Sequence, residues 1–224
     1  MKYFTSEFLD FYKDLAANNN RDWFQSERKR YESFIKKPME VFVTDLIAAM
    51  AKHDKSLVGI RYSDAMFRIN RDIRFSKDKT PYKTNSSAAV SASGKKADGE
   101  AGLYVELGPE KLALAGGIYM PDKEGLLRIR DAMTKQPKAF MKALEDPTFK
   151  KIWGSMQGEK NKIIAAEHKE AADAIPYVYH KQFYFWKELP IKHITSDKLM
   201  DVIMEHYIAA KPISKLLNDA LRSA

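Results

Sequence analysis

The sequence predicts the α+β fold class, with an antiparallel β-meander of about four to six strands packed against N-terminal and C-terminal helices. Apolar residues recur at helical spacing in the first third of the chain, alternate with polar residues between positions 63 and 119, and return to helical spacing toward the C-terminus. The 224 residues are 45% hydrophobic, so the chain can bury roughly 70% of its extended-state surface. Since no Pro/Gly/Ser linker divides the chain, we expect a single domain over residues 1–224.

Three helices are predicted in the N-terminal third. The asparagine run 18–20 separates the first from the second, because asparagine tolerates left-handed C-caps and is also a good N-cap. The second helix begins near Asp22, and the third runs from Pro38, which suits a first helical turn, to about His53. The predicted buried residues are Phe4, Phe8, Tyr12 and Leu15, then Phe24, Tyr31 and Ile35, then Val41, Phe42, Leu46 and Met50.

Four strands are predicted where the hydrophobic period changes to two. They cover residues 65–70, 85–93, 103–107 and 112–119, with turns at 94–99 and 108–111. Such short connections imply antiparallel neighbours.

The C-terminal part is predicted to be mostly helical. Pro121 and Pro137 each suit a helix start, and a long terminal helix follows Ser196. Pro212 is expected to kink or split that last helix. The aromatic stretch 177–189 reads as a further strand, and the predicted buried residues of the helices are Leu126, Ile129, Met133, Phe140, Leu144, Leu199, Ile203 and Tyr207.

Composition and missing motifs exclude several classes of site. The chain has no cysteine, which excludes disulfides, thiolate nucleophiles and cysteine-ligated metals and fits a reducing cytoplasm. It shows no signal peptide and no apolar run near the ~20 residues of a membrane span, so we expect a cytoplasmic protein with no membrane partner. The five histidines lack paired metal spacing, and no phosphate loop or known catalytic motif is present. We therefore expect no metal and no cofactor, and whether the protein is an enzyme stays open.

The main candidate site is residues 68–84, RINRDIRFSKDKTPYKT, called here the basic segment. Its six cations outnumber its two carboxylates, so four positive charges are left for a bound anion or for acids elsewhere in the fold to balance. The net charge of +8 also favours anionic partners. The candidate ligand-binding residues are Arg68, Arg71, Asp72, Arg74, Asp78, Lys79, Tyr82 and Lys83, with Lys77 as the sixth cation.

An extended chain over residues 67–75 would divide the segment into two sides. Arg68, Asn70, Asp72 and Arg74 would then face one way, while Ile69, Arg71, Ile73 and Phe75 would face the core. Asp72 can hold one arginine, which leaves the other guanidinium for a phosphate or carboxylate. An inward Arg71 needs a partner, which Asp64, Glu106 or a ligand can supply.

The basic segment resembles the signature of an uncharacterised bacterial family, also found in fungi, that is known as a domain of unknown function. The family pattern is Arg-x-x-Arg-Asp-x-Arg-Phe followed by Asp or Asn, Lys and Tyr, which corresponds here to Arg68, Arg71, Asp72, Arg74, Phe75, Asp78, Lys79 and Tyr82. NNNRDWF (18–24), GGIYMP (116–121) and LLRIR (126–130) are similar to further family elements. The resemblance covers roughly the first 135 residues and implies a shared fold without an assigned activity.

Binding of a phosphate-bearing or carboxylate-bearing ligand is the first functional hypothesis, because it would balance the excess cations. The alternatives are an enzyme acting on a phosphorylated substrate with Asp72 or Asp78 as base or metal ligand, a nucleic-acid-binding protein, and a structural role in which a partner protein covers the segment. Beside so many cations the pKa values of Asp72 and Asp78 should fall, which suits ion pairs better than general acids. Gly116-Gly117, with Arg128 and Arg130 in the following helix, is a weaker anion-site candidate.

Overall fold

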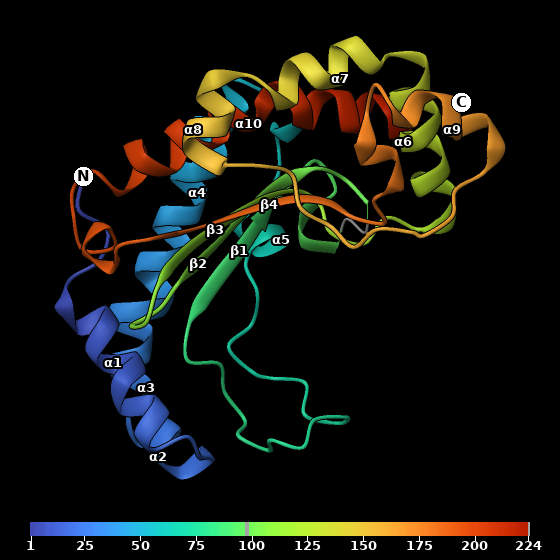
Figure 1. The fold of residues 1–224 in the computed structure, drawn as a ribbon. Helices are drawn as coiled ribbons and strands as arrows, with labels where there is room; N and C mark the ends of the chain where they lie inside the picture. Colours follow the sequence, from blue (N-terminus) through green and yellow to red (C-terminus); the bar gives the residue numbers. More distant parts are fainter. Residues whose placement is uncertain (97–98, 224) are drawn as a thin grey trace. The chain divides into compact units, whose positions relative to one another are not determined.

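A computed structural model describes residues 1–96 and 99–223 and confirms the α+β class and the antiparallel meander. One four-stranded sheet has the order β1-β2-β3-β4, so neighbours in the sequence are also neighbours in the sheet (Figure 1). The strands are β1 (Ser86–Val90), β2 (Gly102–Leu107), β3 (Leu112–Ile118) and β4 (Phe183–Leu189).

The chain forms two compact units, and β2, β3 and β4 each contribute residues to both. The first unit comprises Met1–Val90, Tyr104–Leu114 and Glu188–Met204. The second unit comprises Ser91–Leu103, Ala115–Lys187 and Glu205–Ala224. The expectation of one domain over residues 1–224 stays a prediction.

In the first unit an aromatic core joins the N-terminal helices. The Phe8 ring lies 4.5 Å from that of Phe4 and 5.4 Å from that of Tyr12, and all three side chains are buried. Asn20 caps the second helix by accepting a 2.9 Å hydrogen bond from the Trp23 backbone N–H, as its place in the asparagine run predicted. These elements are α1 (Ser6–Ala17), α2 (Arg21–Ser26), α3 (Arg28–Tyr31), a π-helical turn (Glu32–Lys36) and α4 (Lys37–Ala51), followed by a 3₁₀ turn (Lys55–Leu57).

Two helix predictions for this unit were wrong in detail. The second helix is broken, because its first piece ends at Ser26 and the stretch before Lys37 contains a π-helical turn. Val41 is 46% exposed, because α4 buries instead the face that carries Met39, Val43 and Leu46.

The predicted strand at residues 65–70 does not form. Residues Tyr62–Ala65 make a short helix, α5, and only isolated bridges follow, between Met66 and Ala88 and between Asn70 and Tyr82. Pro81 has no N–H to donate, so its backbone contributes only an acceptor, to the Arg71 N–H at 2.9 Å. The basic segment is therefore an irregular pair of antiparallel arms rather than part of the sheet.

The second unit has its own core, made by helices and the glycine-rich end of β3. A side chain at Gly116 would collide with the Phe185 ring, 2.2 Å from the Cβ position, and one at Gly117, where φ is +85°, would meet the Phe183 carbonyl oxygen at 2.2 Å. The glycines thus let β3 and β4 approach closely. The helices are α6 (Lys123–Lys135), α7 (Pro137–Leu144), α8 (Pro147–Trp153), α9 (Ala166–Ala172) and the later part of α10 (Leu199–Arg222).

Two further predictions need correction, and a third is borne out over the residues that the structure describes. The stretch 177–189 is a strand only from Phe183, because Pro176–Tyr179 is a 3₁₀ turn. Pro212 does not split α10, which continues through it to Arg222. The turn predicted at 94–99 begins with a 3₁₀ turn at Gly94–Lys96, while 97–98 lie outside the described residues. Within the described ranges, no helix has the length and apolarity that a bilayer span requires.

Candidate functional site

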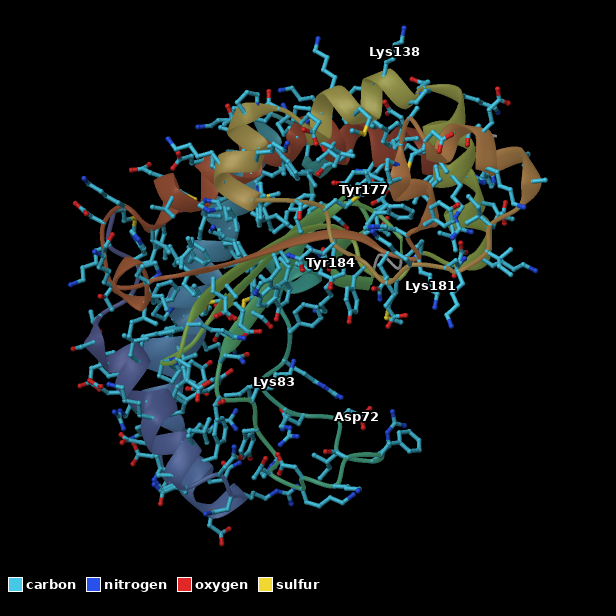
Figure 2. The ribbon with its side chains drawn as sticks, in the orientation of Figure 1. Asp72, Lys83, Lys138, Tyr177, Lys181 and Tyr184 are labelled. Carbon is cyan, nitrogen blue, oxygen red and sulfur yellow. The ribbon has the colours of Figure 1, made fainter. Side chains whose placement is uncertain are left out.

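The basic segment connects α5 to β1 as an irregular excursion of the first unit (Figure 1). Lys83 lies nearer to β1 than Asp72 does (Figure 2). The predicted alternation survives without a strand, since Arg68, Asn70, Asp72 and Arg74 are exposed and Ile69, Arg71 and Ile73 are half-buried. Phe75, however, is 96% exposed, so its predicted packing into the core is wrong.

Tyr82 anchors the second arm of the segment to the turn between α1 and α2. Its ring is buried and stacks on Phe24 with the ring centroids 4.1 Å apart. The Asn19 side chain makes two hydrogen bonds to the same residue, accepting from the Tyr82 N–H at 3.1 Å and donating to the Tyr82 carbonyl at 2.9 Å. The asparagine run therefore holds the basic segment in place as well as capping helices.

Both aspartates of the segment form ion pairs with its arginines. Asp72 accepts two hydrogen bonds from Arg74, at 3.0 Å from Nε and 2.7 Å from Nη2. Asp78 pairs with Arg71, whose Nη1 also donates to the Thr80 hydroxyl. The partners proposed for Arg71 from the sequence were wrong: Asp64 binds Arg61 at 3.0 Å, and Glu106 accepts from the Tyr104 hydroxyl at 2.8 Å.

These pairs lower the pKa values of both carboxyl groups. Hydrogen bonds from the Arg74 side chain and backbone lower the pKa of Asp72 to about 2. The Thr80 backbone N–H, followed by the Arg71 side chain, lowers the pKa of Asp78 to about 2. Both groups are thus ionised at neutral pH and already accept hydrogen bonds from neighbouring donors.

Four cations of the segment have no carboxylate partner among the described residues: Arg68, Lys77, Lys79 and Lys83. Lys79 is used within the segment, because its ammonium donates to the Ile73 carbonyl at 2.9 Å. Lys77 is exposed. Arg68 and Lys83 remain, one from each arm, and both line the same pocket.

This pocket, called here the Arg68–Lys83 pocket, lies wholly in the first unit. Its interior volume of about 10 Å³ has room for about one oxygen-sized atom. No aspartate or glutamate lines it, whereas three cations, four hydroxyl groups and one carboxamide do. Its polar lining residues are Tyr12, Tyr31, Lys36, Arg68, Lys83, Asn85, Ser86 and Ser87.

The electrostatics of the pocket are those of excess positive charge. The pKa of Lys83 is lowered, first by burial and then by the nearby Arg68 charge, with Glu106 acting in the opposite direction. The Lys83 ammonium lies 5.2 Å from the Phe67 ring centroid, a cation–π contact that offsets only part of that cost. A bound anion would relieve the repulsion between the two cations.

Neutral hydroxyl groups complete the pocket. Tyr12 Oη and Ser86 Oγ lie 2.5 Å apart, and burial raises the pKa of Tyr12. Burial likewise raises the pKa of Tyr31. Both phenols therefore keep their protons and can donate to an anion, a pattern that suits a phosphate or carboxylate oxygen.

The sequence prediction located part of this pocket and missed the rest. Arg68 and Lys83 were predicted, while Lys36, Tyr12 and Tyr31 come from helices that the sequence alone does not bring close. The other predicted site residues lie in ion pairs (Arg71, Asp72, Arg74, Asp78), on a backbone carbonyl (Lys79) or in the core (Tyr82). The pair Ser86-Ser87, at the start of a strand, was the available signal for extra donors.

A larger cavity of about 300 Å³ in the second unit is less suited to an anion. It is lined by Glu100, Asp122 and Glu124 as well as by Arg128 and Arg222, and its arginines are paired, Arg128 with Glu124 and Arg222 with Glu100. Its carboxylates outnumber its arginines, so the cavity has no excess of positive charge. Within the described part of the chain, no cluster of three His, Asp or Glu side chains is placed to hold a metal ion.

Comparison with known proteins gives one match. A family model described as conserved hypothetical protein (DUF2461) matches residues 7–215. The match extends well beyond the first 135 residues that the motifs indicated and includes the region 150–190. Neither the curated proteins nor the solved structures contain a match to the chain.

Proposed function

The chain belongs to the DUF2461 family of conserved hypothetical proteins, and we propose that it binds an anionic ligand, bearing a phosphate or carboxylate group, at the Arg68–Lys83 pocket. The observation that carries the proposal is the lining of that pocket. Three cations and four hydroxyl groups surround a space that no carboxylate lines. Elsewhere in the basic segment the acids Asp72 and Asp78 already neutralise Arg74 and Arg71.

The pocket volume limits how the ligand enters. About 10 Å³ accommodates a single oxygen atom, so one oxygen of the anionic group sits inside and the remainder of the ligand lies at the mouth. Arg68 and Lys36 are exposed and can contact that remainder. Guanidinium forks bind two oxygens of one phosphate or carboxylate group, so Arg68 would set the orientation of the group.

Thermal unfolding in the presence of inorganic phosphate tests the proposal. Phosphate at about 100 times its Kd would stabilise the native state by about 2.7 kcal/mol, which for a chain of this size raises Tm by roughly 5–10 °C. We expect Arg68→Gln and Lys83→Gln each to remove most of the increase, because each deletes one of the two cations that face each other. Sodium chloride at matched ionic strength serves as the reference condition.

Two further variants make the test specific. Lys77→Gln removes one positive charge from an exposed position of the same segment and should leave the phosphate response intact. Arg74→Gln should reduce it only in part, because it frees Asp72, whose charge interacts with Arg68. An equal loss in all four variants would show a general charge effect and would contradict a site at this pocket, as would the absence of stabilisation by phosphate, sulfate and small carboxylates.

Nucleic-acid binding is a second candidate, favoured by the position of Phe75. Its ring is 96% exposed, the Arg74 guanidinium lies 5.8 Å from the ring centroid, and Lys77 and Lys79 are exposed nearby in sequence. An exposed aromatic ring among cations can stack on an unpaired base while the cations contact phosphates.

Fluorescence anisotropy with a labelled single-stranded oligonucleotide tests this second candidate. Affinity should fall steeply with added salt, and Phe75→Ala should cost about 1–3 kcal/mol, the contribution of one stacked base. Phe34→Ala, at another exposed phenylalanine of the first unit, is the matched control and should have no effect. An oligonucleotide affinity that does not change with salt concentration, or that Phe75→Ala leaves unchanged, would exclude this candidate.

An enzyme acting on a phosphorylated substrate has no specific support from the geometry. The two carboxylates proposed as its base, Asp72 and Asp78, each have a pKa of about 2 and are bound by arginines. Such groups are weak proton acceptors at neutral pH.

A further inference from the structure

A second group of basic side chains lacks acidic partners, and it lies in the second unit around His180. Arg130 on α6 is only 6% exposed, and its Nη2 donates to the His180 carbonyl at 3.1 Å. Its Nε is buried without a hydrogen-bond partner. No carboxylate among the described residues pairs with this guanidinium, and a buried cation without a counter-charge is costly.

His180 carries the second unsatisfied buried atom of this group. The side chain is 4% exposed, and its Nδ1 has no hydrogen-bond partner. The imidazole packs between the rings of Tyr177 and Phe183, whose centroids lie 5.1 Å and 6.4 Å from its own. Tyr177 and Lys181, the residue that follows His180, are labelled in Figure 2. Two neighbouring residues therefore each present a buried polar nitrogen with nothing bound.

A chain segment lies directly against His180 and brings a third cation. Residues 157–161 pair with 179–184 through bonds that include Lys181 N–H to the Glu159 carbonyl at 2.7 Å and Asn161 N–H to the Tyr179 carbonyl at 2.7 Å. Gly158, with φ of +153°, allows this approach, because a Cβ there would lie 3.0 Å from His180 Nδ1. Lys160 is close enough that its charge, after burial, lowers the pKa of His180.

We propose that Arg130, His180 and Lys160 form a second anion-binding site, which takes one oxygen of a phosphate or carboxylate group between Arg130 Nε and His180 Nδ1. The three side chains come from α6, the 157–161 segment and the stretch before β4, and the described residues place no carboxylate on any of them. With the imidazole protonated, Nδ1–H and Nε–H both donate, and Lys160 adds a charge at the exposed edge. This site does not depend on the Arg68–Lys83 pocket.

Proton uptake by His180 distinguishes an anion from a buried water. The groups that face the imidazole are Arg130 from α6, Lys160 from the 157–161 segment and the phenol of Tyr177, together with the backbone carbonyls of Gln157 and Gln182, which act to raise its pKa. Without an anion, burial and then Lys160 keep the pKa of His180 below its ordinary value. An anion favours the imidazolium, so it must raise that pKa, whereas a neutral water that bridges the two nitrogens leaves it unchanged.

The experiment is an NMR titration of His180 in the full chain carrying Arg68→Gln and Lys83→Gln, so that the first pocket cannot contribute. Inorganic phosphate, compared with chloride at equal ionic strength, should raise the His180 pKa, and Lys160→Gln should reduce that rise. Lys181→Gln is the matched control, because its ammonium pairs with Glu159 at 3.3 Å on the surface. It should leave the rise unchanged.

A variant at the buried arginine separates binding from a structural role. Arg130→Met fills a similar volume without charge, and in this variant phosphate should no longer raise the His180 pKa or Tm. If phosphate leaves the His180 pKa unchanged in the parent chain, the site is absent and a water only fills the gap; an equal rise in the Lys160→Gln chain and the parent chain would exclude Lys160 from the site. Because Lys160 is exposed, its variant will fold even where Arg130→Met does not.

Discussion

Single charged residues decide which cations of the basic segment keep a positive charge that no carboxylate pairs with. Six cations and two acids leave four positive charges by sequence, yet the structure distributes them unevenly. Arg71 and Arg74 are neutralised in place, Lys79 holds the Ile73 carbonyl, and Arg68 and Lys83 face one pocket without a carboxylate. The local sequence shows that cations outnumber acids. It does not show which cations stay unpaired, because that depends on which arginine each aspartate contacts.

The titration of Asp72 and Asp78 tests this distribution at the residue scale. Because their folded-state pKa values are lowered to about 2, the stabilisation that they contribute is present above their ordinary pKa and is lost as the pH falls through about 2. Carboxyl-carbon NMR should therefore find both groups still ionised at about pH 3.

Removing one arginine provides the control for that titration. Arg74→Gln should return the pKa of Asp72 toward its ordinary value and leave that of Asp78 low, because Asp78 is held by Thr80 and Arg71. If both carboxyls of the unmodified chain titrate in their ordinary range, the ion pairs are not formed in solution. Arg71 and Arg74 would then be without carboxylate partners as well.

At the scale of elements, the turn between α1 and α2 positions the second arm of the basic segment. Asn19 bonds both the N–H and the carbonyl of Tyr82, one residue before Lys83. A strand pattern was predictable from the alternation of residues 65–70, and alternating exposure is found from Arg68 to Arg74. The strand itself fails because Pro81 cannot donate and because the register shifts between the two bridges, Met66 with Ala88 and Asn70 with Tyr82.

Asn19→Ala tests this anchoring. Loss of two half-buried hydrogen bonds should lower the free energy of unfolding by about 1–3 kcal/mol and weaken phosphate binding, because the arm that carries Lys83 is released. Asn18→Ala is the matched control, since Asn18 makes only an exposed side-chain bond to the Asp14 carbonyl at 3.0 Å. Denaturant unfolding measures the first effect. Equal destabilisation by the two variants would show that Asn19 acts only as a helix terminator.

For the whole molecule, the sequence predicted the fold class, the meander and most helices. These follow from the hydrophobic period and from helix-start residues such as Asn20 and Pro137. It did not predict the broken second helix, the continuity of α10 through Pro212, or the pocket partners Lys36 and Tyr12. Each of these depends on tertiary packing that local pattern does not encode. The motif resemblance reached residue 135, and the family match extends it to 215.

At this scale the net charge attracts anions, and selectivity would have to come from a specific site. A net charge of +8 draws anions to the whole surface, so a weak response to phosphate alone does not identify a site. What marks the Arg68–Lys83 pocket is that its lining contains cations and hydroxyl groups and no acid. The decisive measurement must therefore locate the anion as well as detect it.

Crystals of the full chain soaked in selenate, an analogue of phosphate and sulfate whose selenium scatters anomalously, provide that measurement. Anion binding at the pocket predicts an anomalous peak within hydrogen-bonding distance of both Arg68 and Lys83, and its loss in Arg68→Gln crystals. Selenate found only at other cations, or a Lys83 ammonium paired with a carboxylate of the chain, would contradict it.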